Sequence, residues 1–328
     1  MNVNVCITVD TEFTIAGAFN EPSKNTPVSL ESVFCNISGK SNGLIYILDI
    51  LNKFNLNCTF FLEALNTNYF GDEPLQYVAN VIKEYNQDIQ LHLHPCWRVF
   101  KDKKWADKVS ESPPGDTLVG KTVNECVEII EEGINTFKRI GIQEPKALRT
   151  GNLYIDNNIY KAMNLLGLKM SSNIGLGISM PDNENLRYRG GRHKIDNVME
   201  VPVTTYRDIH SPIYSHDKCF TIIGTSFMEM KNILQSAIEK NIKTIVILTH
   251  PSEFVKRNDH KYKALKPNKV TQKRFIKLCE YLDKNRDKYN TISIRQAVDL
   301  WSNSEEKDHY IKVPLMLTVL RYLEGKLI

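Results

Sequence analysis

Two short stretches of the chain carry pairs of side chains that bind divalent metals. In VCITVDTE, Asp10 and Glu12 are two positions apart, and in DIQLHLHPCW, His92 and His94 have the same spacing. Side chains two positions apart lie on one face of an extended strand, so each pair can point to a common place. Imidazole and carboxylate groups suit Zn²⁺ and other divalent transition metals. The spacing predicts one divalent metal site, with Zn²⁺ as the first choice, where two strands end.

Two more candidates follow other predicted strands. Arg149 stands in KALRTGNLYID, where Gly151 allows a tight turn, and an arginine beside Asp10 would keep that carboxylate ionised. His250 ends the apolar run IVILTH and is a candidate acid. Cys96 is either a thiolate ligand or, as we favour, a buried bystander thiol. We assign the remaining histidines to solvent or loop positions: His193, His210, His216, His260 and His309.

The composition is that of a soluble globular protein. The chain has 328 residues, of which 24% are charged and 42% hydrophobic. The net charge of +4 is too small to indicate nucleic-acid binding, and no apolar run approaches the length of a transmembrane helix. Seven scattered cysteines without a CxxC pair indicate neither a zinc finger nor a disulfide framework. The N-terminus reads as a core strand rather than a signal peptide, so we expect a cytoplasmic protein.

Short apolar runs alternate with longer amphipathic stretches, which is typical of βα units around a parallel sheet. We expect strands at 3–9, 57–63, 88–93, 145–148, 168–173, 198–203 and 243–249, with shorter ones near 219–223 and 290–293. We expect helices at 43–54, 74–86, 122–140, 156–166, 226–240 and 270–286. Six or more such units predict a whole or distorted barrel, whose active-site mouth lies at the loops after the strands. The long loops are 14–41, 95–121, 174–197 and 251–269.

The end of the chain differs in character. We expect residues 1–300 to form the barrel and residues 301–328 to form an amphipathic helical tail. Pro314 would begin a helix that is dense in apolar residues. We expect this helix to dock on the barrel or on a second subunit, and the alternative is a weak contact with a membrane surface. The sequence does not predict the oligomeric state.

The four motifs together resemble those of the polysaccharide deacetylase family, also called the NodB-homology or carbohydrate esterase family 4 group. In chain order they read VDTE, HLHP, LRTGNLY and LTHP, and the resemblance spans residues 1–255. Each motif is short, but their order and spacing make the combination moderately specific. The resemblance implies an α/β fold, a distorted (β/α)7-type barrel with one catalytic metal, here with a C-terminal helical appendage.

The resemblance also implies metal ligands. Glu12 stands near the family's metal-binding aspartate, although many members have two adjacent aspartates and Thr11 replaces the second one here. His92 matches the first metal-binding histidine. The second usually follows four positions later, where this chain has Cys96, so His94 takes its place as in relatives with an HxHP motif.

By the same resemblance, Asp10 matches the catalytic base, Arg149 the arginine that pairs with it, and His250 the general acid. The family's separate aspartate that orients the acid is not identifiable. The implied activity is metal-dependent removal of N-acetyl groups from an amino sugar. A cytoplasmic enzyme would act on precursors of capsule or O-antigen type, such as nucleotide- or lipid-linked sugars. Trp97, Trp105, Tyr154 and Tyr206 are candidate faces for a sugar ring, although residues of this kind are more often simply part of the core.

Two alternatives remain open. The same metal site could hydrolyse a small cyclic amide or imide, which would need a deep, enclosed site rather than a groove. The protein could also be a non-catalytic member that binds a glycan or a partner protein. Metal content and acetate release would separate these readings.

Overall fold

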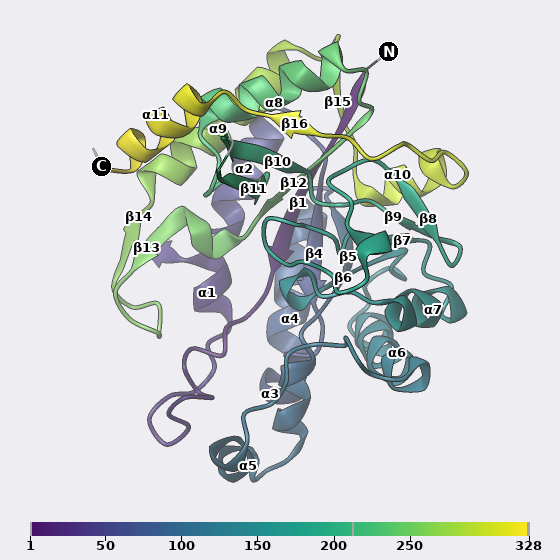
Figure 1. The fold of residues 1–328 in the computed structure, drawn as a ribbon. Helices are drawn as coiled ribbons and strands as arrows, with labels where there is room; N and C mark the ends of the chain where they lie inside the picture. Colours follow the sequence, from purple (N-terminus) through teal and green to yellow (C-terminus); the bar gives the residue numbers. More distant parts are fainter. Residues whose placement is uncertain (1, 212, 327–328) are drawn as a thin grey trace.

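The fold is built on a curled sheet with a continuous row of seven parallel strands, surrounded by helices (Figure 1). The structure, a computed structural model, describes residues 2–211 and 213–326. In spatial order the strands are β12 (Thr244–Thr249), β1 (Val3–Thr11), β4 (Cys58–Glu63), β5 (Asp88–Leu93), β6 (Ala147–Thr150), β7 (Met170–Ser171) and β9 (Val198–Glu200). This arrangement confirms the predicted α/β, distorted (β/α)7-type barrel.

The strands are apolar along their length because both faces of the sheet are covered. In β1, Val5, Ile7 and Val9 pack with the surrounding helices, whereas Cys6 belongs to the interior cluster. Side chains alternate along a strand, so Asp10 lies on the same interior face as Cys6. The alternation that buries the core thus also turns a carboxylate towards the barrel axis.

Six long helices cover the outside of the sheet, and each lies within two residues of its predicted bounds. Two of them begin with a reciprocal capping box, in which Thr122 pairs with Glu125 and Ser226 with Glu229. The helices are α2 (Leu44–Lys53), α4 (Asp72–Glu84), α6 (Val123–Arg139), α7 (Asn157–Leu165), α8 (Phe227–Glu239) and α9 (Lys269–Lys284).

Irregular hydrogen bonds close the gap between β9 and β12. The Thr204 amide donates to the Val246 carbonyl at 3.0 Å, and the Leu248 amide donates to the Phe220 carbonyl at 3.0 Å. These contacts replace a regular ladder, which is why the barrel is distorted. The sheet is extended by β15 (Tyr289–Thr291), which pairs in parallel with β1, and by β8 (His193–Ile195), which is antiparallel to β9.

Several short elements lie in stretches for which no secondary structure was predicted. They include two hairpins, β10 (Thr205–His210) with β11 (Ser215–Cys219), and β13 (Val255–Arg257) with β14 (Leu265–Pro267). The strand expected near 219–223 corresponds to the end of β11 and one isolated bridge. The others are α1 (Leu30–Phe34), β2 (Asn36–Ile37), β3 (Lys40–Ser41), α3 (Thr67–Phe70), α5 (Trp105–Glu111), α10 (Ile294–Trp301), β16 (Ile311–Lys312) and the 3₁₀ turns Pro95–Lys101, Gly151–Leu153, Glu184–Leu186 and Pro251–Phe254.

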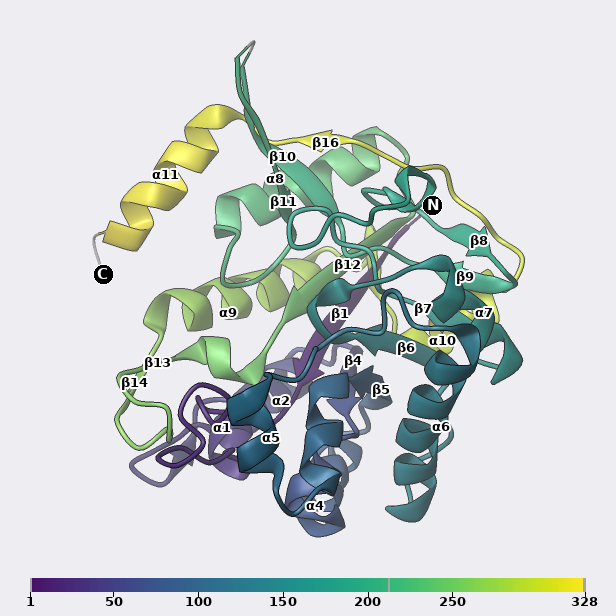
Figure 2. The same cartoon turned by 60° about the horizontal axis from the view of Figure 1, so that its bottom comes forward.

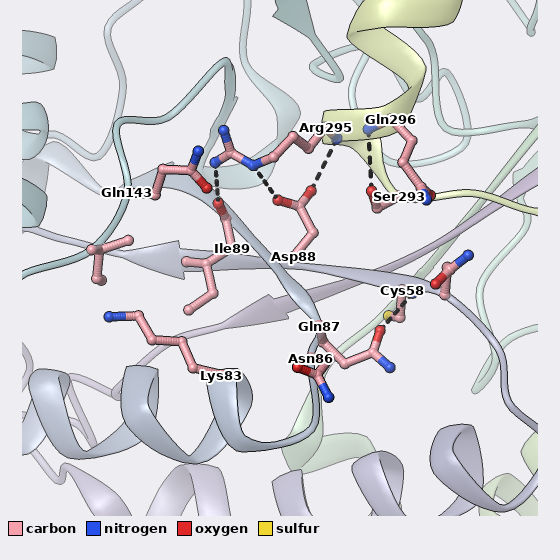
Figure 3. Close-up of a pocket in the computed structure, with 12 residues that line it drawn as sticks. Cys58, Lys83, Asn86, Gln87, Asp88, Ile89, Gln143, Ser293, Arg295 and Gln296 are labelled. Carbon is pink, nitrogen blue, oxygen red and sulfur yellow. Dashed lines mark hydrogen bonds and ion pairs between the residues drawn. The ribbon is translucent and has the colours of Figure 1, made fainter.

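The two ends of the barrel differ in what they hold. β1 runs from the N-terminus towards the lower end of the molecule in Figure 1, and Figure 2 brings that lower end forward. At the opposite end, α10 packs Ile294, Ala297 and Trp301 into the barrel interior. A cavity of about 290 Å³ lies beside it, where Asp88 joins the start of β5 to Arg295 (Figure 3).

The C-terminal helix α11 (Leu315–Lys326) begins directly after Pro314, as predicted. Its docking differs from a simple apolar contact. Arg321 turns inward and pairs with Asp208 and Glu229 at 2.7 Å each. The outward face is apolar and exposed, and it comprises Leu315, Met316, Val319, Leu320, Tyr322 and Leu323. The helix therefore docks on the barrel through this charged pairing together with Leu317, which packs against the core, and Thr318, which donates to the Asp208 carbonyl. Contact of its exposed apolar face with a second subunit or a membrane surface stays a prediction.

No helix in the described part of the chain is long and apolar enough to cross a membrane. The cytoplasmic location and the division of the chain at residue 300 also stay predictions.

Candidate active site

All six predicted site residues lie at the carboxyl-terminal end of the parallel strands. The register places Val9 beside Thr249 and His92 beside Arg149, so the residues that follow these strands share one edge. In a parallel barrel this edge is where the active site forms. The residues brought together are Asp10, Glu12, His92, His94, Arg149 and His250.

Glu12, His92 and His94 converge on one point. Their ligand atoms all lie within 4.8 Å of one another. Glu12 Oε2 is 2.8 Å from His94 Nε2 and 3.6 Å from His92 Nε2. One carboxylate and two imidazoles are a ligand set that zinc and related ions use, with further positions left for water or substrate.

The hydrogen bonds behind the two histidines fit metal binding. His92 Nδ1 lies 2.8 Å from the Arg149 carbonyl, and His94 Nδ1 lies 2.6 Å from Asp116 Oδ2. Both partners are acceptors, so each Nδ1 carries a proton and each Nε2 is the ring nitrogen directed towards Glu12. A carboxylate or carbonyl behind a ligating histidine is the usual arrangement in metal sites. These residues therefore fit a divalent cation.

Asp10 is held by a buried arginine. Arg149 Nη1 donates to Asp10 Oδ1 at 2.7 Å and to Thr8 Oγ1 at 2.9 Å. Its other nitrogens donate to the Ser172 carbonyl at 3.0 Å and hydroxyl at 2.7 Å, and its guanidinium lies 4.2 Å from the Phe61 ring centroid. Because the arginine is fully buried and its hydrogen bonds fix its position, it also fixes the direction of the Asp10 carboxylate.

His250 faces Asp10 from the other side. Its Nε2 is 4.0 Å from Asp10 Oδ2, and its Nδ1 is 2.8 Å from Glu253 Oε1. Glu253 in turn accepts a hydrogen bond from Thr249 Oγ1 at 2.7 Å. Burial lowers the pKa of His250, but Glu253 and Asp10 outweigh that effect and raise its pKa to about 9. The ring is thus cationic near neutral pH.

The charges around Glu12 favour its ionised form. Burial raises the pKa of Glu12, but His94 and His92 outweigh it and hold the pKa well below its usual range. The reverse holds for His94, whose pKa burial lowers and the carboxylates of Glu12 and Asp116 raise. Glu12 is therefore anionic, which is the form of a carboxylate that a cation can bind.

Sequence reasoning missed three carboxylates of the site. Glu253 contacts His250 as the orienting acid missing from the sequence motifs would. A 3₁₀ turn that begins at Pro251 bends the chain so that the Glu253 carboxylate reaches the His250 ring. Asp116 lies in the long loop after β5, and nothing in its local sequence marks it. Glu63 ends β4 and accepts hydrogen bonds from three backbone amides, and burial raises its pKa to about 8.

The remaining candidates fall into clear places. Cys96 is buried and burial raises the pKa of its thiol far above the usual value, so it stays a neutral thiol, although it lies close to His94 and Asp116. Tyr206 is a core residue, because its ring is fully buried and its hydroxyl donates to Thr225 at 3.2 Å. Trp105 packs against other aromatic rings away from the metal-binding group.

Gly151 is needed for close approach. A Cβ at this position would lie 2.4 Å from the His94 ring, so any larger residue would displace that ligand. Gly151 thus serves close approach rather than a special backbone angle: the backbone that follows β6 passes directly behind His94, and the left-handed residues of this turn are Asn152 and Leu153.

A cavity of about 310 Å³ lies beside Glu12 and His94. Asp116, the almost fully buried Trp97, and Arg257 and Tyr262 of the β13–β14 hairpin line it as well. Tyr154 is exposed and lines a separate hollow. Of the four aromatic candidates for a sugar-binding face, only Trp97 lines this cavity.

No family model and no curated protein matches this sequence. Solved structures do match. A candidate polysaccharide deacetylase from Mycobacterium smegmatis has a TM-score of 0.51 at 13% identity, over 90% of this chain and 89% of its own. A family 4 carbohydrate esterase from Streptomyces lividans, in complex with acetate, has a TM-score of 0.43 at 11% identity, over 89% of this chain and 92% of its own.

A 4-α-glucanotransferase from Thermococcus litoralis also has a TM-score of 0.51, at 10% identity, over 99% of this chain and 47% of that enzyme. At such low identities the likeness establishes the fold, so the resemblance to the polysaccharide deacetylases inferred from the four motifs is confirmed at that level. Because a glucanotransferase is equally similar, the fold alone does not select the chemistry. The side chains at the strand ends must decide it.

Proposed function

We propose that the protein is a metal-dependent hydrolase that removes the N-acetyl group from an amino sugar or a polysaccharide precursor. One observation carries the proposal: a metal-type group of Glu12, His92 and His94 lies beside a carboxylate that an arginine fixes and a histidine faces. Hydrolysis of an amide needs a base for water, an electrophile for the carbonyl and an acid for the amine, and this arrangement contains a candidate for each.

Asp10 is the proposed base. Its Oδ1 is occupied by Arg149, which leaves Oδ2 directed towards His250 and open to accept a proton from a water molecule. A divalent cation held by Glu12, His92 and His94 would acidify that water and polarise the amide carbonyl. Arg149 keeps the Asp10 carboxylate from rotating.

His250 is the proposed acid. Cleavage of the C–N bond requires a proton on the leaving nitrogen, and the ring is protonated near neutral pH because its pKa is about 9. Glu253 holds Nδ1, so Nε2 is the atom that faces the reaction and transfers the proton. The products are acetate and a free amino group on the sugar.

The direct test combines elemental analysis with an acetate assay on wild type and Asp10→Asn. We expect about one divalent ion per chain in both proteins, acetate release from an N-acetylated sugar by wild type, and a loss of about 10²–10⁴-fold in kcat for the variant. A wild type that binds metal but releases no acetate from any N-acetyl sugar would contradict the proposal.

The same assay tests the alternatives. The cavity beside Glu12 and His94 has a volume of about 310 Å³, which is at the small end of ligand sites and would also suit a cyclic amide or imide. Hydrolysis of a cyclic imide without acetate release would favour that substrate class. Absence of both metal and activity would favour a non-catalytic binding protein.

A further inference from the structure

The β13–β14 hairpin carries an unusual concentration of positive charge beside the active-site cavity. Between the ends of the hairpin there is one carboxylate, on Asp259, and it accepts backbone N–H groups of Lys261, Lys263 and Ala264. It therefore stabilises the turn. None of the hairpin cations forms an ion pair with another described residue, and these are Lys256, Arg257, Lys261, Lys263 and Lys266.

Arg257 is the cation of this hairpin that lines the cavity, together with Glu12 and His94. Its guanidinium lies 4.9 Å from the centroid of the Tyr262 ring, and its side chain is exposed. Within the described residues it has neither an ion pair nor a side-chain hydrogen bond. Its planar set of N–H donors is therefore available to a ligand, and such donors match phosphate and carboxylate oxygens.

The hairpin is held firmly enough to present this arginine. Tyr262 is buried and packs with Val255 and Cys35 in a small separate apolar cluster. Tyr262 also has a left-handed backbone with φ of 57°, which is a costly conformation for a bulky residue. The Tyr262 ring lines the cavity and lies under the Arg257 guanidinium, so a buried ring supports the position of the cation.

We propose that Arg257 binds an anionic substituent, a phosphate or a carboxylate, on the sugar whose N-acyl group lies at Glu12, His92 and His94. This inference rests on the proposed function and names its substrate class. Glu12 and Asp116, which also line this cavity, contact His94 at 2.8 and 2.6 Å. Arg257 has no such partner among the described residues, so its guanidinium is the lining group that is available to an anion.

Lys256 offers a matched control. It precedes Arg257 in β13 and has the same charge and a similar exposure, but it does not line the cavity. Adjacent residues of a strand point to opposite faces. A general electrostatic attraction would weaken equally when either charge is removed, whereas a specific contact would weaken with Arg257 alone.

The first experiment measures binding by isothermal titration of the purified protein with N-acetylglucosamine, N-acetylglucosamine 1-phosphate and N-acetylmuramic acid, the last of which carries a carboxylate. We expect at least one anionic sugar to bind more tightly than the neutral one. Arg257→Gln should weaken that binding about tenfold, and Lys256→Gln should change it by about twofold or less. The anionic sugar whose affinity falls in Arg257→Gln but not in Lys256→Gln shows whether the group bound by Arg257 is a phosphate or a carboxylate.

Equal affinity for all three sugars, or equal losses in the two variants, would overturn the inference. The second measurement is acetate release with the same sugars, in which Arg257→Gln should lower kcat/KM for the anionic sugar and leave that for N-acetylglucosamine unchanged. If no sugar releases acetate, the deacetylase proposal fails, while the titration still decides whether Arg257 recognises an anion. Unchanged thermal melting of both variants would show that the fold is intact.

Discussion

Asp10 and Glu12 are two positions apart, yet their neighbours give them different chemistry. Asp10 contacts the buried guanidinium of Arg149, whereas Glu12 contacts two imidazoles. The first environment suits a fixed base, and the second suits a metal ligand. The proposed roles of Asp10 as base and Glu12 as metal ligand thus rest on the different side chains that each contacts.

The Glu253→Gln variant should shift the pH dependence of kcat. The wild-type ring of His250 is protonated below about pH 9, so the rate should fall as the pH rises through that value. Glutamine keeps an acceptor for Nδ1 but removes the charge that raises the pKa, so the alkaline limb should move to lower pH. A pH–rate profile measures this shift. Metal content should not change, and an unchanged alkaline limb would contradict the assignment of His250 as the acid.

The Asp116→Asn variant should bind metal more weakly. Asp116 Oδ2 lies 2.6 Å from His94 Nδ1 and also lies 3.4 Å from the Asn152 side-chain amide. Loss of such a partner behind a ligating histidine typically costs about 10–100-fold in metal affinity. Competition with a chelator, read by elemental analysis, measures the change. Asp182→Asn, in the loop before β8, is the control, and an equal loss in both variants would show that the contact is unimportant.

The helices and strands differ in how far the local sequence alone accounts for their formation. β1 and β12 are buried on both faces and read as apolar runs, so their sequences alone predict them. The β10–β11 hairpin is different, because its polar strands are held by α11 and by the buried pair of Asp208 with Arg321. No local pattern in those strands predicts that Asp208 pairs with Arg321, a residue more than a hundred positions away.

Replacing Arg321 with alanine should destabilise the protein strongly. The substitution leaves the buried carboxylates of Asp208 and Glu229 without their shared cation. Breaking a buried pair in this way costs about 3–5 kcal/mol of unfolding free energy. Val319→Ala on the exposed face of α11 is the matched control and should cost about 0.5 kcal/mol or less. Chemical denaturation compares them, and similar values would mean that α11 contributes little to the fold.

The two ends of the barrel differ in their contents: the candidate active site lies at one end, and contacts that stabilise the fold lie at the other. The strand ends that hold Glu12, His92 and His94 carry long loops, whereas at the opposite end α10 packs into the barrel interior and Asp88 pairs with Arg295. This is the arrangement expected of parallel barrels. The second cavity, shown in Figure 3, therefore belongs to the structural end.

The Asp88→Ala variant should lower stability without changing catalysis. Asp88 accepts hydrogen bonds from Thr59, Gln90 and both the backbone and side chain of Arg295. Losing them should cost about 2–4 kcal/mol, since several donors lose their acceptor together. Denaturation measures the loss, and kcat with metal content measures the site. Gln143→Ala, in the same cavity, should change neither, and a fall in kcat of folded Asp88→Ala would link this end to the chemistry.

Local sequence patterns were enough to predict the βα order, the positions of most strands and helices, and the six residues at the strand ends. These depend on local causes, namely apolar periodicity and polar residues that directly follow buried strands. The contacts of Glu253 with His250 and of Asp116 with His94, the docking of Arg321 against Asp208 and Glu229, and the place of Arg257 in the cavity beside Glu12 and His94 become visible in the folded chain alone. These contacts depend on how the loops bring residues together in space. Loops have no hydrophobic periodicity, so such contacts cannot be predicted from the local sequence.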